Sequence, residues 1–156
     1  MSVSDVASDS ASVVEPCLAR LTSTDEGPTD YDAVLHDSVV LLTAPQFVAQ
    51  SVDWQVAAIQ AVFIRMTVSL HAQAGAAAAL AAPHFARLLG SPETTLAQAC
   101  LLHDAMWGMW WCAAASLDDM RPVQTSVCIP FHRFLERRGL VSAGARDARE
   151  PGPCLL

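Results

Sequence analysis

Apolar residues recur at helical spacing along most of the chain. In residues 31–42, large apolar side chains follow one another at intervals of three and four, which is the period of an amphipathic helix. A second stripe runs through residues 52–73, directly after Ser51, whose hydroxyl can cap the first turn. Four further apolar positions widen the surface of this second stripe: Ala57, Ala61, Ile64 and Val68. We therefore expect the helix to pack on two neighbours.

The longest apolar pattern covers residues 92–117. Ser91 can act as the N-cap and Pro92 suits the first helical position, and no further proline occurs before residue 118. One helix over 92–117 would be roughly 39 Å long. From Ala105 onward its only polar side chain is Ser116. A helix that is apolar all round is buried on all sides, inside its own domain or against another molecule.

Shorter elements complete the pattern. A turn of helix is expected over 45–50 and a short helix over 83–89, closed by Gly90. The alanine-rich residues 75–82 either continue the preceding helix or form a second segment. Residues 123–129 are ambiguous, with a β-branched content that favours extended chain, and a last helix is expected over 130–138.

These elements predict an all-α, single-domain bundle of five to seven helices around a central apolar helix at about 92–117. We expect residues 1–29 to be an acidic, largely disordered leader, residues 30–140 to be the bundle and residues 141–156 to be a flexible tail. Within the leader, residues 13–21 are apolar enough to form a short helix that docks on the body instead.

Charge is concentrated in the leader. The formal net charge is −7, and residues 1–38 hold eight acidic residues against Arg20, whereas residues 39–156 are balanced. Nucleic-acid binding requires a basic surface, so we expect no nucleic-acid partner. The chain is lysine-free, since all nine basic residues are arginine. GC-rich coding and selection against lysine modification both explain this composition.

Cysteine usage and hydropathy suggest an intracellular protein. The five cysteines are odd in number and form no CxxC pair, so we expect reduced thiols in a cytoplasmic compartment. The sequence shows no N-terminal signal segment and no uninterrupted apolar run of about 18 to 20 residues. We therefore expect no transmembrane segment, and we expect no cofactor.

One stretch points to catalysis. Residues 97–104 read AQACLLHD, an apolar helix ending in His103 and Asp104. This resembles the HD-domain signature of metal-dependent phosphohydrolases, in which both residues ligate a metal and an upstream histidine assists. The resemblance implies His71, His103 and Asp104 as metal ligands, and a degenerate phosphohydrolase as the alternative function.

A second resemblance points to binding. The step Trp107-Gly108 within an apolar helix is similar to the Trp-Gly step of the central helix in Bcl-2-type apoptosis regulators. Those proteins wrap amphipathic helices around one apolar helix, and the resemblance implies a regulator that holds a partner helix in an apolar groove.

No complete catalytic constellation occurs in the sequence, so our leading hypothesis is non-catalytic. Large apolar side chains are concentrated in one stretch of the chain, which favours an interaction module that binds a protein partner or associates with itself. The side chains expected to make this contact are Trp107, Met109, Trp110 and Trp111.

Overall fold

The predicted all-α bundle is confirmed. A computed structural model describes the backbone of residues 3–24, 27–114 and 117–142 and the side chains of 13–24, 27–114 and 118–142, and this part of the chain contains no strand. The predicted tail over 141–156 lies almost entirely outside the described residues. The α-helices are α1 (Val3–Thr22), α2 (Tyr31–Thr43), α3 (Val52–Ser69), α4 (Ala74–Gly90), α5 (Leu96–Ala113), α6 (Arg121–Val123) and α7 (Ile129–Arg137). Short single-turn elements are η1 (Pro45–Ala49), η2 (His71–Gln73), η3 (Leu117–Met120) and η4 (Gln124–Cys128).

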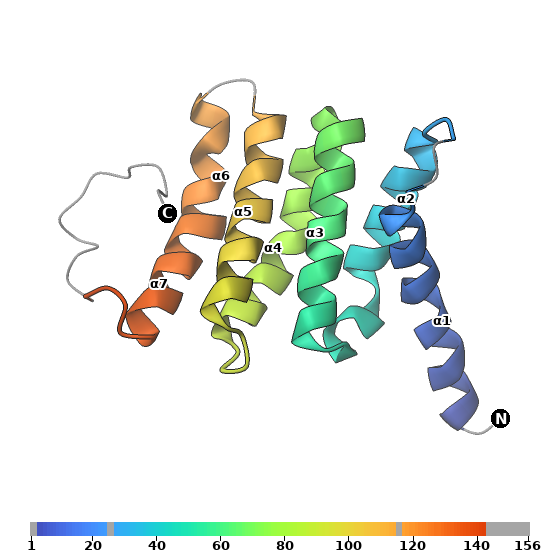
Figure 1. Cartoon of the computed structure of the whole chain (residues 1–156), viewed down its shortest axis with the longest axis horizontal. Coiled ribbons are helices and arrows are strands. Elements are labelled where there is room, and N and C mark those ends of the chain that lie inside the picture. Colours follow the sequence, from blue (N-terminus) through green and yellow to red (C-terminus); the bar gives the residue numbers. More distant parts are fainter. Residues whose placement is uncertain (1–2, 25–26, 115–116, 143–156) are drawn as a thin grey trace.

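The helices stand side by side, with α1 and α2 at one end of the row and α6 and α7 at the other (Figure 1). In this view α3 and α5 are neighbours, and α4 runs behind them. Gln98, near the start of α5, donates a hydrogen bond to Asp53, near the start of α3. Further along, Gly108 of α5 meets the ring of Phe63 of α3. The two contacts have the same sequence offset, so α3 and α5 run parallel.

The helix starts follow local capping. Asp30 accepts a hydrogen bond from the amide of Ala33 at the start of α2, and Ser51 accepts one from Trp54 at the start of α3. Both caps satisfy amides that the first helical turn leaves without an intrahelical partner. These two helices begin where the sequence predicts, because their start signals depend only on residues within one turn.

Residues 1–29 differ from the expected disordered leader. Most of this segment is α1, and its side chains Val14, Cys17 and Leu21 are buried against the body. The alternative of a docked helix over 13–21 therefore describes this region better. Three apolar side chains at intervals of three and four give α1 a stripe that packs on α2 and α3.

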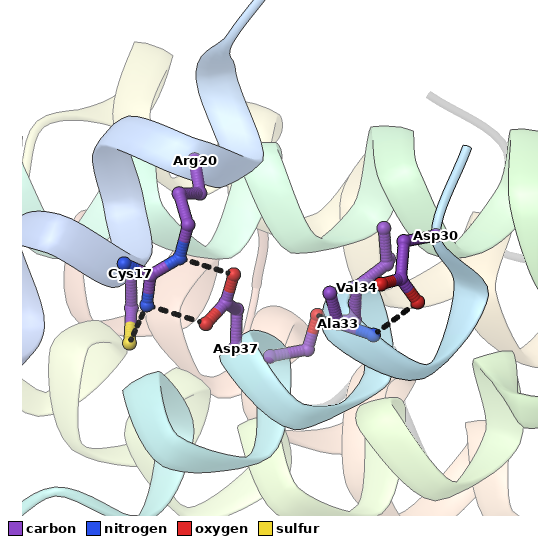
Figure 2. A network of polar contacts seen from close by, with 7 residues as sticks. Cys17, Arg20, Asp30, Ala33, Val34 and Asp37 are labelled. Carbon is purple, nitrogen blue, oxygen red and sulfur yellow. Dashed lines mark hydrogen bonds and ion pairs between the residues drawn. The ribbon is translucent and has the colours of Figure 1, made fainter. Parts of the chain in front are cut away.

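An ion pair between the exposed Arg20 and the buried Asp37 joins α1 to α2 (Figure 2). Arg20 donates from Nε to Oδ2 of Asp37 at 2.8 Å and from an Nη to Oδ1 at 2.7 Å. These bonds lower the pKa of the Asp37 carboxyl, although its burial acts in the opposite direction. Burial and the neighbouring Asp37 raise the pKa of the Cys17 thiol. Trp54 donates a further bond to Glu15 of α1, at 2.9 Å.

Two predicted boundaries around α4 and α5 are wrong. Residues 74–90 form one continuous helix with Pro83 inside it, rather than two segments. The helix α5 begins at Leu96 and not at Pro92, with Thr95 and Gln98 forming a reciprocal capping box. The Thr94 hydroxyl donates to the Leu88 carbonyl at 2.5 Å, which holds the α4–α5 connection out of the helix. The helix is therefore 18 residues long rather than 26.

Residues 123–129 are helical, not extended. Together α6, η4 and α7 form one nearly continuous rod (Figure 1). Val123, Val127 and Phe131 are buried along it at intervals of four, so packing overrides the β preference of this stretch. The rod ends at Gly139, whose φ of 69° suits the left-handed position after a helix. Beyond α7, Arg138 donates to the carbonyls of Pro92 and Thr94.

Three of the cysteines match the prediction of reduced thiols and one does not. Cys17, Cys100 and Cys112 are free, whereas Cys128 is disulfide-bonded. Among the described residues, none of the helices combines the length and hydropathy needed to cross a bilayer.

Candidate interaction face

Large apolar side chains lie exposed on the two parallel helices α3 and α5. The exposed fractions are 56% for Ile64 and 78% for Val68 on α3, and 44% for Leu101 and 58% for Trp111 on α5. Ala57 and Ala97 extend the same two stripes and are also exposed. We call this set the α3–α5 face: Ala57, Ile64, Val68, Ala97, Leu101 and Trp111.

Helical geometry brings these residues to one side of the molecule. On α3, Ala57, Ile64 and Val68 follow one another at intervals of seven and four, so they share one side of the helix. On α5, Ala97, Leu101 and Trp111 follow one another at intervals of four and ten, which also places them on one side of the helix. Each helix buries its opposite side in the core, so the two exposed stripes lie next to each other on the outside of the pair.

Gly108 allows α3 and α5 to approach closely. A Cβ atom at this position would lie 2.4 Å from Cε2 and 2.9 Å from Cζ of Phe63, so any larger residue would force the ring to move. Phe63 is half-buried and lies between the two exposed stripes. On α5, Trp107 stacks on Trp111 with ring centroids 6.5 Å apart and an interplanar angle of 15°.

The charges on this pair of helices are acidic. Asp104 has 66% of its side chain exposed, and its Oδ1 lies 3.3 Å from Nδ1 of His103. Asp53 is exposed at the start of α3. The single basic residue of α3 and α5 is Arg65, which points away toward α1 and donates to the carbonyls of Leu21 and Ser23. Arg65 therefore supplies no counter-charge to Asp104.

The four side chains predicted to make contacts separate into three environments. Trp111 is exposed, and Trp107 is half-buried against it. Trp110 is half-buried, and its ring lies 3.8 Å from the position of a Cβ at Gly75 on α4. Met109 is fully buried, so it belongs to the core and not to a contact surface. The protein therefore leaves one stripe of α5 exposed and does not bury this helix on all sides.

The residues implied as metal ligands do not converge. His71 is exposed in η2, just before α4. The start of α4 lies against the end of α5, because a Cβ at Gly75 would be 3.0 Å from the Ala113 Cβ. His71 is therefore near the end of α5. His103 lies ten residues earlier on α5, roughly 15 Å along the axis. It is buried against Phe131 with ring centroids 4.5 Å apart, while Asp104 points to solvent. In the described part of the chain, no three His, Cys, Asp or Glu side chains are placed to hold a metal ion.

Sequence reasoning missed Ile64, Val68 and Leu101. The signal was present on α3, where apolar positions exceed what one buried stripe requires. We interpreted the excess as packing on a second neighbour, and the structure leaves Ile64 and Val68 exposed instead. Both interpretations fit the same periodicity, because periodicity does not show which sides of a helix are covered.

Comparisons with protein-family models, with curated proteins and with solved structures find no match to this chain. Any functional interpretation therefore depends on the residues and geometry of the chain itself.

Proposed function

We propose that this protein is a non-catalytic helical interaction module that binds a protein partner through the α3–α5 face. The observation that carries this proposal is the exposure of Ile64, Val68, Leu101 and Trp111 on two adjoining helices. Single exposed apolar residues are ordinary on a protein surface. Several large ones gathered on one side, with a tryptophan among them, are typical of a contact surface.

The arrangement is suited to binding because its support is rigid. Regular helices hold the exposed side chains, and α5 is anchored from behind by fully buried Leu102, Met106 and Met109. The face therefore keeps its shape in the absence of a partner, which reduces the ordering cost of association. Trp111 has few rotatable bonds and a large area, properties that favour it as an anchor.

A stability comparison tests whether the exposed side chains serve the fold. The triple variant Ile64→Gln, Val68→Gln and Trp111→Gln should change the free energy of unfolding by less than about 1 kcal/mol, because surface substitutions have small effects. The matched control Met109→Ala should cost about 2–5 kcal/mol, because it opens a cavity in the core. Urea unfolding monitored by circular dichroism measures both.

A selection experiment then tests binding. A displayed library of helical peptides, balanced in charge, is selected against the immobilised protein and, in parallel, against the triple variant. We expect peptide families that bind the unmodified protein and fail to bind the variant. If no family depends on the α3–α5 face, or if the triple variant unfolds, the proposed function is refuted.

A further inference from the structure

We infer that the α3–α5 face takes an amphipathic helix of another protein whose apolar stripe carries a Lys or Arg opposite Asp104. This inference rests on the proposed function and specifies the partner. It follows from the placement of one carboxylate, from the charges around it and from the geometry of self-pairing.

The shape of the face fits a helix. The exposed stripes belong to two parallel helices, and α5 is 18 residues long, roughly 27 Å. A helix laid along this pair can present residues at intervals of three, four and seven to both stripes at once, which is the usual mode of helix-in-groove recognition. The apolar residues on α3 and α5 set the requirement for an apolar stripe on the partner.

Asp104 sets the requirement for charge. It is the ninth of the 18 residues of α5, so it lies halfway along the face, between Leu101 and Trp111. A bound helix would remove this carboxylate from water, and an unpaired buried charge is costly. His103 lies 3.3 Å away but is buried against Phe131, so a cation on the exposed side of the carboxylate must come from the partner.

A second copy of this chain that presents the same face does not supply that cation. If two copies pair with α5 on α5, their central Asp104 carboxylates come together and repel. If they pair with α5 on α3 in the parallel register, Asp104 lies level with Ile59, next to Gln60, and neither residue is charged. The only basic residue on either helix, Arg65, is directed toward α1. Self-pairing therefore leaves Asp104 without a counter-charge in both arrangements.

A membrane surface fits the face less well for the same reason. Helices that lie in a bilayer interface carry basic residues beside their apolar side, because the cytoplasmic leaflet is anionic. The exposed charged residues beside the α3–α5 face are Asp53 and Asp104 instead. An acidic residue in the middle of an apolar surface selects for a basic partner and against both alternatives.

The test uses two synthetic 18-residue peptides with identical leucine stripes, one flanked by arginines and one by glutamates at the same positions. Fluorescence anisotropy gives the Kd of each for the full chain, for Asp104→Asn and for the matched control Asp32→Asn, an exposed acidic residue of α2. Because the chain has a net charge of −7, some preference for the basic peptide is nonspecific. The control removes the same charge away from the face and corrects for this.

We expect the basic peptide to bind more tightly than the acidic one. Asp104→Asn should reduce the ratio of the acidic-peptide Kd to the basic-peptide Kd by about threefold or more. Asp32→Asn should change this ratio little. Asp104→Arg should reverse the preference. Equal reductions in Asp104→Asn and Asp32→Asn, or tighter binding of the acidic peptide, would overturn the inference while leaving the proposed function in place. Failure of both peptides, with dimerisation or vesicle binding that Trp111→Gln abolishes, would also overturn it. Failure of both peptides together with no binder from the library refutes the proposed function itself.

Discussion

Replacing Gly108 with alanine tests how the α3–α5 pair is built. In an ordinary helix interior this change stabilises by up to about 1 kcal/mol, because alanine has the higher helix propensity. At Gly108 the new Cβ would lie 2.4 Å from Cε2 of Phe63. Ordinary van der Waals contact begins at 3.4 Å, so the ring must retreat by about 1 Å.

Phe63 is half-buried between α3 and α5 and packs against the core, so its neighbours must shift when its ring retreats. Overpacking of this kind costs about 1–3 kcal/mol, which exceeds the gain in propensity. We therefore expect Gly108→Ala to lower the free energy of unfolding by about 1 kcal/mol and the melting temperature by roughly 2–4 °C.

Removing the ring should reverse the sign. In a Phe63→Ala background the clash is absent, so Gly108→Ala should stabilise by a few tenths to about 1 kcal/mol. A double-mutant cycle by urea denaturation should then give a coupling energy above about 1 kcal/mol, as expected for residues in contact. Gly90→Ala is the control, since a Cβ there meets nothing within 4 Å. Stabilisation by Gly108→Ala with Phe63 in place would refute the close packing of α3 on α5.

Three further predictions concern the helix anchors. Because Arg20 lowers the pKa of Asp37 below its ordinary 3.8, the pair stabilises the docked α1 above about pH 4 and this contribution is lost as pH falls through the lowered pKa. Hydrogen exchange measured by mass spectrometry, corrected for intrinsic rates, should show α1 losing protection in that window before α3 does. At neutral pH, Asp37→Asn should accelerate tryptic cleavage after Arg20, while unchanged cleavage would show that the pair does not hold α1. Thr95→Ala should cost about 1 kcal/mol in urea unfolding and Ser91→Ala much less, and the opposite order would contradict the observed start of α5.

The functional side chains were only partly predictable. The sequence pointed to residues 105–117 as the place where apolar area exceeds what one core requires, and Trp111 does lie exposed there. It could not separate Trp111 from Met109, two positions earlier, which is fully buried. On a helix two neighbouring positions face different directions, and the location of α4 decides which of them is covered.

Features that depend on residues within one or two helical turns could be predicted from the amino-acid sequence. The all-α class follows from apolar spacing, and the starts at Asp30 and Ser51 follow from caps that act within one turn. Such interactions join residues three or four apart, so the linear order of the chain contains them completely.

Tertiary structure decided the choice between competing local signals. Ser91 and Thr95 are both good caps, and α5 starts after the second. The Thr94 hydroxyl donates to the Leu88 carbonyl and the Thr94 carbonyl accepts from Arg138, and these two bonds hold the connection in place. Likewise the acidic composition of residues 1–29 suggests disorder, whereas the ion pair between Arg20 and Asp37 holds α1 against α2. In both cases the bonding partners belong to other parts of the fold: Leu88 to α4, Arg138 to the residue after α7 and Asp37 to α2. Their positions depend on how the whole chain packs.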